Sequence, residues 1–314
     1  MYQMIINPAS CSGRGRQYWE SLEKYLCQHR IPYTAHFSEK MGHITRITRD
    51  LTRKLDGDSQ PLHIIVVGGD GSLNEALQGI CNFQKVRFSY IPTGSGNDFA
   101  RALNMAKDPV ENLERILYSG SERAMDIGKA TYDIGGGRFE SRYFAVSCGL
   151  GFDAAVCEAV FHSSVKRLLN RIGLGKLIYL LHSLRLLACE EPVLATLTLE
   201  DLGQSADFNH LLFATGMNHK YEGGGFMFSP NANSADGFVD ICLVADISRL
   251  KILRVLPTAF KGTHLKYKGV YAFHTKCYTI TTKAPLWLQT DGEVLARTQA
   301  LTVSCIPQLL HFYC

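Results

Sequence analysis

Apolar and polar residues alternate along the first third of the chain in blocks that predict strands followed by helices. The run His63–Val67 is dominated by β-branched residues, which is typical of a strand buried on both faces. The predicted strands are Met4–Ile6, His63–Val67 and Phe88–Pro92, and apolar residues at helical spacing predict helices around Tyr18–Leu26, Leu73–Ile80 and Asp98–Asn104. Strands that alternate with helices favour an α/β fold, with a parallel sheet and helices on its faces.

The pattern changes near Met125, where short strands separated by turn residues replace the alternation of strands and helices. The expected strands are Arg142–Cys148, Val193–Glu200, His210–Thr215, Gly237–Ala245, Tyr278–Thr282, Leu286–Thr290 and Leu301–Ile306. Two helical stretches interrupt them, roughly Ala154–Ala188 and Ser248–Gly262. We therefore expect a second domain of antiparallel β-sandwich or barrel type.

Composition narrows the class of protein. The 314 residues, 46% hydrophobic and 20% charged, suffice for two domains with ample cores. The net charge of +4 is compatible with a phosphate ligand or an anionic membrane and requires neither. No basic stripe with interleaved aromatic residues is present, which argues against a nucleic-acid partner. The 10 cysteines include no Cys-x-x-Cys pair, so they indicate a reducing compartment rather than disulfides or a zinc site.

Two segments bear on targeting and membrane insertion. Met1–Asn7 has no basic region and only a short apolar stretch, so we expect a first strand there and not a signal peptide. Leu168–Ala188 is interrupted by three cations, Arg171, Lys176 and Arg185, so we expect no membrane-spanning helix there.

The strongest local signal is the glycine-rich block Gly68–Glu75, which follows a predicted strand and precedes a predicted helix. Glycine backbone approaches a phosphate closely, and a helix N-terminus directs N–H groups at it. Ser72 and Glu75 have the spacing of a capping box, and Asp70 could hold Mg²⁺ against phosphates. The block is neither a Walker A loop nor a dinucleotide fingerprint. A tight turn with Asp70 as a turn residue stays open as the alternative.

Two more loops have the same character. Pro92–Arg101 again places glycines between a strand and a helix, and Asn7–Arg16 is rich in Ser, Gly and Arg, which suits an anion. Arg14 and Arg16 could equally be solvated. In a doubly wound sheet, loops at neighbouring strand ends line one crevice, so the loops are expected to act together.

These motifs resemble those of the diacylglycerol kinase catalytic family, most closely the soluble bacterial lipid kinases and more distantly the sphingosine kinases. The matching blocks are Gly68–Glu75, Pro92–Arg101, Gly149–Ala154, the group Gly223–Gly225, Ser229–Ala232 and Asp236–Asp240, and Gln289–Glu293. They cover nearly the whole chain in order, and five linked motifs are more specific than any one of them.

The resemblance implies a nucleotide-binding α/β domain, residues 1–125 with about 296–314, similar to NAD kinases and phosphofructokinases. It implies a β-rich lipid-substrate domain at 126–295, with the active site in the cleft between the two. The cofactors would be ATP and Mg²⁺. The implied ATP-binding residues are Asn7, Pro8, Ser12, Gly13, Arg14, Ser38, Gly68, Gly69, Asp70, Gly71, Ser72, Asn74, Glu75, Gly94, Ser95, Asn97 and Asp98. Ser38, Ser72 and Ser95 replace family threonines and keep the hydroxyl, so we expect small effects on ATP binding.

Three carboxylates are the catalytic candidates. Glu293 matches the family's proton acceptor, Asp291 would assist it, and Asp70 lies in the phosphate loop. Carboxylates two residues apart on a strand point to the same side, unless Gly292 introduces a turn. Because Asp-Gly is also a common hairpin signal, a plain β-turn stays open as the alternative.

The resemblance also implies a structural Mg²⁺ site, with a side-chain oxygen from Asp236 and main-chain oxygens from Asn233 and Phe238. Hard cations prefer such oxygen ligands. A surface turn between strands is the alternative interpretation.

Two basic amphipathic stretches, 161–188 and 249–268, are candidates for contact with an anionic membrane. Their apolar residues could instead pack onto the β-rich domain. With no anchor expected, these stretches predict a cytoplasmic protein associated peripherally with the inner face of the membrane.

The predicted function is ATP-dependent phosphorylation of a lipid hydroxyl, with diacylglycerol giving phosphatidic acid as the first candidate. The alternatives are a kinase for another lipid or for a soluble hydroxyl compound, as in NAD kinases, and a catalytically silent regulator. Intact Asp70, Asp291 and Glu293 argue against the regulator. Many relatives form dimers, so a homodimer is also an open expectation.

Overall fold

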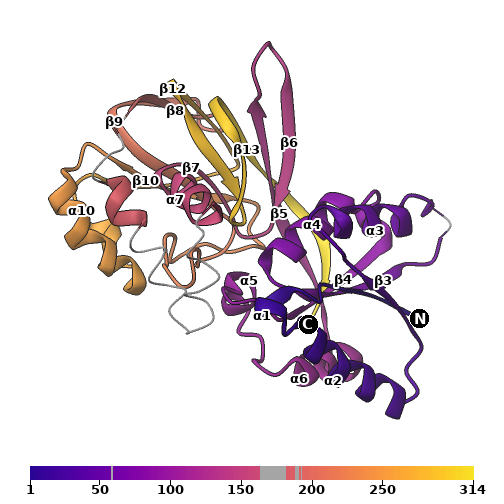
Figure 1. Cartoon of the computed structure of the whole chain (residues 1–314). Coiled ribbons are helices and arrows are strands. Elements are labelled where there is room, and N and C mark those ends of the chain that lie inside the picture. Colours follow the sequence, from indigo (N-terminus) through magenta and orange to yellow (C-terminus); the bar gives the residue numbers. More distant parts are fainter. Residues whose placement is uncertain (58, 163–181, 188–190, 192) are drawn as a thin grey trace. The chain divides into compact units, whose positions relative to one another are not determined.

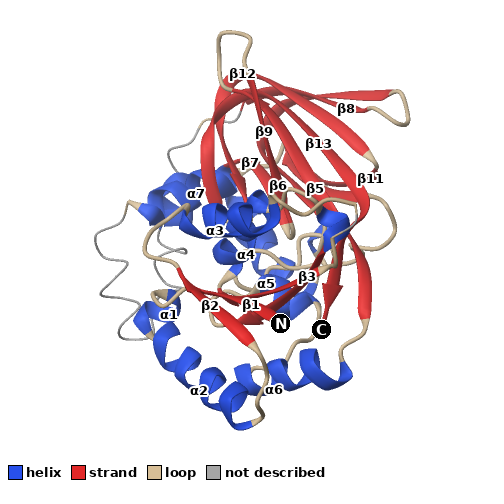
Figure 2. Cartoon of the chain, turned by 90° about the vertical axis from the view of Figure 1, so that its right-hand side faces the viewer, coloured by secondary structure: helices blue, strands red, loops and turns tan. Residues whose placement is uncertain are grey.

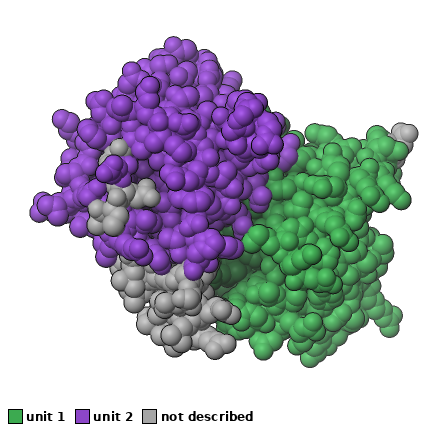
Figure 3. All heavy atoms as spheres, turned by 45° about the horizontal axis from the view of Figure 1, so that its top comes forward, with its two compact units in different colours: residues 1–127, 307–314 green, residues 128–306 purple. Residues whose placement is uncertain are grey.

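The computed structural model describes residues 1–57, 59–162, 182–187, 191 and 193–314. The chain divides into two compact units, coloured separately in Figure 3. Unit 1 comprises Met1–Ile127 and Pro307–Cys314, and unit 2 comprises Gly128–Ile306. Each unit has its own secondary structure and its own hydrophobic core.

Unit 1 is built on a parallel sheet. Its strands are β1 (Tyr2–Ile6), β2 (Tyr33–Phe37), β3 (Leu62–Gly68) and β4 (Val86–Pro92), in the order β2-β1-β3-β4. The last residues of β13 (Glu293–Tyr313) pair in parallel with β4 through His311 and Phe312. The inner strands are almost fully buried, as their continuous apolar runs predicted.

Helices cover both faces of this sheet, as Figure 2 shows. The helical elements of unit 1 are α1 (Ser10–Gly13), α2 (Gly15–Gln28), α3 (His43–Thr52), α4 (Asp70–Gly79), η1 (Phe83–Lys85), α5 (Asp98–Ala102), α6 (Pro109–Glu114) and η2 (Arg115–Ser119). Trp19, Leu22 and Leu26 of α2 share a core cluster with Leu113 of α6, while α3 and α4 pack together on the other face. Right-handed crossovers explain why the helices lie on both faces, because the chain moves outward from β1 to β2 and then back past β1 to β3.

The sequence pattern missed β2 and α3. β2 is an edge strand, and none of its five residues is fully buried, so it carries no apolar run. The buried residues of α3 are Ile44, Thr48 and Thr52, so two threonines take positions where the pattern seeks aliphatic residues. Their hydroxyls donate to main-chain oxygens one turn back, which satisfies them inside the core.

Unit 2 is an antiparallel β structure. Its strands are the end of β5 (Glu122–Asp133), β6 (Phe139–Phe144), β7 (Ser147–Gly151), β8 (Val193–Leu199), β9 (Gln204–Met217), β10 (Val239–Ala245), β11 (Val270–Thr275), β12 (Cys277–Thr290) and most of β13. The path of pairing is β11-β10-β9-β7-β12-β13, β8 bonds to both β9 and β12, and β5 pairs with β6. The long strands β9 and β12 thus pair with β8 along one half and with β7 along the other. Leu197, Phe208, Tyr278, Ile280 and Leu301 belong to the core that they enclose.

Three predicted strands of unit 2 are corrected by the structure. The stretch Arg142–Cys148 contains parts of two strands, β6 and β7. The predicted strands Tyr278–Thr282 and Leu286–Thr290 are one strand, β12, with an irregularity between Thr281 and Leu286. A polar, proline-containing stretch at the irregularity hid the continuity.

The two predicted helices of this unit are also altered. The helix expected over Ala154–Ala188 is represented by α7 (Phe152–Phe161) and a helical stretch at 182–187, and most of the rest lies outside the described residues. That gap takes in most of the basic stretch 161–188. The helix expected over Ser248–Gly262 is α10 (Arg249–Val255) followed by the 3₁₀ helices η3 (Leu256–Lys261) and η4 (His264–Lys266). Pro257 has no N–H to continue the α-helical bonding, which explains the change to 3₁₀ geometry.

Over the described ranges, no helix is both long enough and apolar enough to cross a bilayer.

Candidate functional site

The predicted phosphate loops of unit 1 meet at the carboxyl edge of its sheet. Asn7 follows β1 and donates its N–H to Val67 of β3 at 2.9 Å, while Thr93, just after β4, donates its N–H to Gly68 at 2.7 Å. Ser38 follows β2 and donates its N–H to Ile6 at 2.9 Å. The strand order reverses between β1 and β3, so Asn7 and Gly68 flank a topological switch point, where open α/β sheets bind ligands.

Side chains join these loops to one another. The Asn7 amide donates to the Ser72 hydroxyl at 2.9 Å, and the hydroxyls of Ser10 and Thr93 lie 2.9 Å apart. The Asn97 amide both donates to and accepts from the backbone of Gly94. Three loops that are far apart in sequence are therefore held as one cluster. Ser10 and Thr93 were not among the predicted site residues, although both lie inside the loops that were.

Close backbone approach explains the glycines of this cluster. A Cβ on Gly68 would lie 2.4 Å from the Cβ of Ser72, and a Cβ on Gly94 would lie 2.6 Å from the Cα of Gly69. Real Cβ atoms do not approach other atoms so closely. The first and second glycine loops therefore touch backbone to backbone, which leaves no room for side chains between them.

Asp70 links the first glycine loop to the second. Its carboxylate accepts hydrogen bonds from the N–H of Asp98 at 3.0 Å and from the N–H of Phe99 at 3.4 Å. These N–H groups belong to the first turn of α5, so the negative charge stabilises the start of that helix. Asp98 is itself nearly buried and bonds Arg101 at 2.8 Å. Asp70 therefore has a structural role, as the alternative interpretation expected, because it orders the neighbouring loop. It also brings a negative charge to the cluster of loops.

The predicted capping box does not form. Helix α4 begins at Asp70 with Gly69 as its N-cap, so Ser72 already lies inside the first turn. Ser72 uses its hydroxyl with Asn7, and the Glu75 carboxylate accepts the N–H of Ile44 at the start of α3 at 3.1 Å. The spacing was that of a capping box, but both side chains have partners from other elements.

The N-terminal loop is conformationally unusual. Cys11 and Ser12 have φ values of 50° and 59°, and Gly13 has a φ of 94°, so three successive residues are left-handed. Arg14 is exposed and donates to the Cys11 sulfur at 2.9 Å. The predicted ATP contacts Pro8, Ser12, Gly13 and Arg14 lie in the loop that begins at Asn7, and they remain predictions.

In unit 2, Asp291 and Gly292 form a two-residue hairpin between β12 and β13, with Thr290 paired to Glu293. Both turn residues have positive φ, 50° and 82°, as the tight hairpin geometry requires. The Asp291 carboxylate accepts three backbone N–H groups, from Ala145 at 2.9 Å, Val146 at 2.7 Å and Ser147 at 3.0 Å. Gly292 does introduce a turn, so the two carboxylates do not share one face of a strand.

Behind this hairpin lies a buried polar network centred on Gln289, which is fully buried. Its amide nitrogen donates to Asp153 at 3.2 Å and to Glu222 at 2.5 Å, and its amide oxygen accepts the N–H of Gly292 at 2.7 Å. Burial raises the pKa of Asp153 to about 6. The network therefore fixes the position of the hairpin that carries Glu293. Asp153 and Gln289 lie in two of the matched motifs and Glu222 directly precedes a third, but no spacing showed that these three side chains meet.

The predicted Mg²⁺ ligands form a turn before β10. One oxygen of the exposed Asp236 carboxylate accepts the N–H of Phe238 at 3.0 Å, and Gly237 has a positive φ of 79°. Within the described residues no group of three or more His, Cys, Asp or Glu side chains is arranged to hold a metal. An exposed carboxylate on a turn fits a site completed by main-chain oxygens and water, and such a site stays a prediction.

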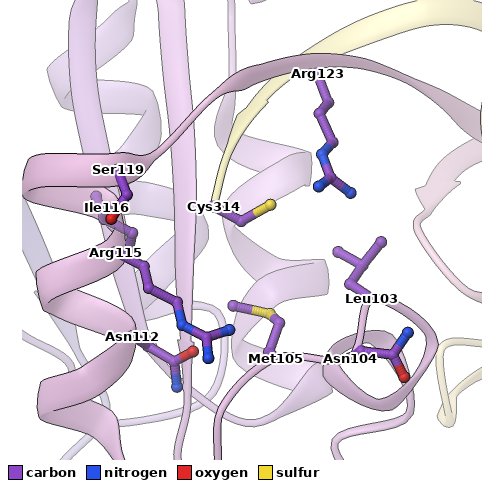
Figure 4. Close-up of a pocket in the computed structure, with 9 residues that line it drawn as sticks. All are labelled: Leu103, Asn104, Met105, Asn112, Arg115, Ile116, Ser119, Arg123 and Cys314. Atoms are coloured by element: carbon purple, nitrogen blue, oxygen red, sulfur yellow. The ribbon is translucent and has the colours of Figure 1, made fainter.

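A separate cavity of about 290 Å³ lies in unit 1 beside α6. Figure 4 shows it lined by Leu103, Asn104, Met105, Asn112, Arg115, Ile116, Ser119, Arg123 and Cys314. Its lining includes none of the predicted ATP-binding residues. Arg115 is already paired with Glu111 at 2.5 Å.

The comparisons with known proteins agree with this organisation. The family model described as the diacylglycerol kinase catalytic domain matches residues 2–130, and the model described as the YegS C-terminal NAD kinase beta sandwich-like domain matches residues 146–314. Among curated proteins, "Putative lipid kinase YtlR" of Bacillus subtilis is 28% identical, covering 94% of this chain and 93% of that protein. The diacylglycerol kinase of Mycobacterium tuberculosis is also 28% identical, covering 79% of this chain and 75% of its own.

Solved structures support the fold. A diacylglycerol kinase structure from Bacillus anthracis superposes with a TM-score of 0.68 at 19% identity, over 99% of this chain and 95% of that one. Yeast NADH kinase in complex with NADH gives a TM-score of 0.55 at 8% identity, over 100% and 82% of the two chains. The predicted fold class, an N-terminal α/β domain and a C-terminal β-rich domain, is confirmed. The two matched family models, which together cover residues 2–130 and 146–314, show that the chain belongs to the diacylglycerol kinase catalytic-domain family of lipid kinases.

Proposed function

We propose that this chain transfers the γ-phosphate of ATP to a lipid hydroxyl, with diacylglycerol as the acceptor and phosphatidic acid as the product. The observation that carries the proposal is the meeting of three phosphate-type loops at the switch point of the unit 1 sheet. Membership of the lipid kinase family supports the reaction class. The choice of diacylglycerol draws on the named relative from Mycobacterium tuberculosis.

In this reaction, unit 1 binds the nucleotide. The backbone of the first glycine loop and the N-terminus of α4 bind the phosphates, and the linked loops keep that backbone rigid. Asp70 lies in the first glycine loop and would bind Mg²⁺ through its carboxylate oxygens, whereas Asp98 is nearly buried and bonded to Arg101. The ion supplies charge neutralisation to the phosphates.

Unit 2 supplies the proton acceptor. A lipid hydroxyl is a weak nucleophile, so Glu293 accepts its proton as the phosphoryl group is transferred. Asp291 acts as a positioning residue, because its carboxylate is bonded to three backbone N–H groups and fixes the turn that precedes Glu293. Gln289 holds the same turn from the buried side through Gly292.

The test uses purified protein with Mg²⁺, radiolabelled ATP and mixed micelles that carry a panel of lipids, beside the variants Glu293→Gln and Glu20→Gln. Glu20 is exposed on α2, so its variant controls for loss of a surface charge. We expect label in diacylglycerol, lowered on the order of 10²- to 10⁴-fold by Glu293→Gln and unchanged by Glu20→Gln.

Other outcomes separate the alternatives. Label in a different lipid would replace diacylglycerol as the acceptor and keep the reaction class. Undiminished label with Glu293→Gln would remove Glu293 as the proton acceptor. ATP binding without label in any lipid would favour a soluble acceptor or a silent regulator, and NAD is the first soluble acceptor to try, given the structural similarity to NADH kinase.

A further inference from the structure

Helix α10 and the following η3 have two apolar faces, of which one is buried. Ile252, Val255 and Ala259 are 8%, 6% and 1% exposed and pack into a core cluster of unit 2 with Cys242 and Val244 of β10. Figure 1 shows α10 beside that strand. This face accounts for the packing of the segment on its own domain.

The second apolar face is exposed to solvent. Leu250, Leu253 and Phe260 are 77%, 41% and 53% exposed, and the exposed Pro257 lies between them. Their spacing of three and four residues places them along one side of the segment. Four of the 13 large apolar side chains that are exposed among the described residues fall between Leu250 and Tyr267, so the exposure is concentrated rather than scattered.

The exposed face is held in place. The Phe260 ring stacks on Phe226 with centroids 4.1 Å apart and an interplanar angle of 27°. The ammonium of Lys251 donates to the main-chain oxygen of Lys268 at 2.8 Å, and Met227 donates its N–H to Ala259 at 2.9 Å. Because the segment is tied to its neighbours on both sides, its apolar face is presented in a fixed orientation.

The segment that carries this face has charged side chains of one sign. From Ile247 to Thr290 the chain contains no Asp or Glu, and it carries eight Lys or Arg residues. Arg254, Lys261, Lys266 and Lys268 are exposed on the same segment as the apolar residues. We call the exposed residues 249–268 the α10 surface.

Charge complementarity selects the occupant of this surface. A second copy of the chain would bring two such cationic surfaces together, and protein interfaces are depleted of lysine. An anionic bilayer offers both an apolar interior for the leucines and phenylalanine and a negative surface for the surrounding cations. We infer that the α10 surface docks this chain on an anionic lipid bilayer, with Leu250, Leu253 and Phe260 inserted at the headgroup boundary. The inference deepens the proposed function, since it gives the lipid kinase a route to a substrate that resides in the bilayer.

Vesicle sedimentation tests the docking without any need for catalysis. Vesicles of phosphatidylcholine alone and of phosphatidylcholine with roughly equal phosphatidylglycerol are compared, at about 50 mM and about 500 mM NaCl, which changes charge screening severalfold. We expect binding to the anionic vesicles that weakens with salt. The triple variant Leu250→Ser/Leu253→Ser/Phe260→Ser and the charge variant Lys261→Glu/Lys266→Glu should each lose at least about tenfold in partition coefficient.

The matched control is Leu194→Ser/Leu202→Ser, which removes two other leucines that are 48% and 52% exposed in unit 2. It should bind vesicles like the unchanged protein. Thermal unfolding of every variant checks that the fold is kept. The inference is overturned if the unchanged protein does not bind anionic vesicles, or if the triple variant binds as well as the control. A dimer in sedimentation analysis that only the triple variant abolishes would overturn it in favour of self-association.

A kinase assay separates this inference from the proposed function. With short-chain dioctanoylglycerol as a dispersed acceptor, the triple variant should keep its rate, while phosphorylation of long-chain diacylglycerol in anionic vesicles should fall with the partition coefficient. Vesicle docking that requires the α10 surface, in a protein that labels no lipid, would refute the proposed function and leave the docking surface intact.

Discussion

Replacing Asp291 by Asn changes one atom of a side chain that accepts three backbone hydrogen bonds. One carboxylate oxygen accepts Val146 and Ser147, and the other accepts Ala145. In the variant one of these positions carries an amide NH₂, which faces an N–H donor and cannot accept from it. The remaining bonds also lose the full charge of the acceptor.

The size of the effect follows from these bonds. A hydrogen bond to a charged group contributes about 1.5–3 kcal/mol, and an N–H left without its acceptor costs about 1–3 kcal/mol when buried. Asp291 is half-buried, so we expect the low end, a loss of about 2 kcal/mol in the free energy of unfolding of unit 2. For a domain of this size that corresponds to a fall of about 4–8 °C in its melting temperature.

The chain's two tryptophans allow the measurement. Trp19 lies in unit 1 and Trp287 in β12 of unit 2, so in a Trp19→Phe background the fluorescence reports unit 2 alone. In urea titrations Asp291→Asn should lower the midpoint, whereas Glu293→Gln should lower it less and reduce kinase activity on the order of 10²- to 10⁴-fold. An unchanged midpoint for Asp291→Asn together with lost activity would refute the reasoning, because Asp291 would then act in the chemistry and not by holding the turn.

Three further changes probe other parts of the two sites. In Gly149→Ala the new Cβ would lie 1.6 Å from a carboxylate oxygen of Asp153, so we expect a destabilised or insoluble protein in expression and melting assays; normal melting would contradict the packing. Asp70→Asn should lower the affinity for ATP at least about tenfold in calorimetry and also lower the melting temperature of unit 1, because the bonds from the N–H groups of Asp98 and Phe99 lose the charge of their acceptor; unchanged binding and melting would contradict this role. The folded pKa of Asp153, about 6, lies above its ordinary 3.8, so the unfolded chain releases this proton first and stability falls as pH rises from about 4 to 6. Urea titrations across this range should show the unchanged protein losing about 3 kcal/mol relative to Asp153→Asn, and parallel curves would contradict the buried, protonated carboxyl.

The parallel sheet of unit 1 was the most predictable part of the fold. β1 and β3 are largely buried and mostly apolar in sequence, and the glycine loops after β3 and β4 mark the ends of those strands. β2 was not predicted because an edge strand needs no apolar run. α3 was not predicted because Thr48 and Thr52 replace aliphatic residues in its buried face. In both cases the missing information lay in the neighbouring element and not in the segment.

The β-rich unit was predictable as a class and less so in its boundaries. β9 and β12 each serve two groups of neighbours, and the irregularity near Pro285 lets β12 change partners without ending. A local sequence pattern cannot distinguish such a bend within a strand from a turn between two strands, because proline and polar residues occur in both. Only the pairing with β7 and β8 shows that the strand continues.

In the candidate sites too, the sequence identified the type of each residue but not the residues that it contacts. Sequence motifs identified Asp70, Asp291 and Glu293 by chemistry, and Asp-Gly was open to two interpretations, as a hairpin or as a catalytic pair. The structure shows the hairpin, in which Asp291 holds the turn and Glu293 follows it, while the catalytic role of Glu293 stays a prediction. Its partners lie about 145 residues away along the chain, and Gln289 meets Asp153 across 136 residues. Contacts of that separation arise from strand pairing, so a motif can name the group that does the chemistry while the groups that aim it become visible only in the folded sheet.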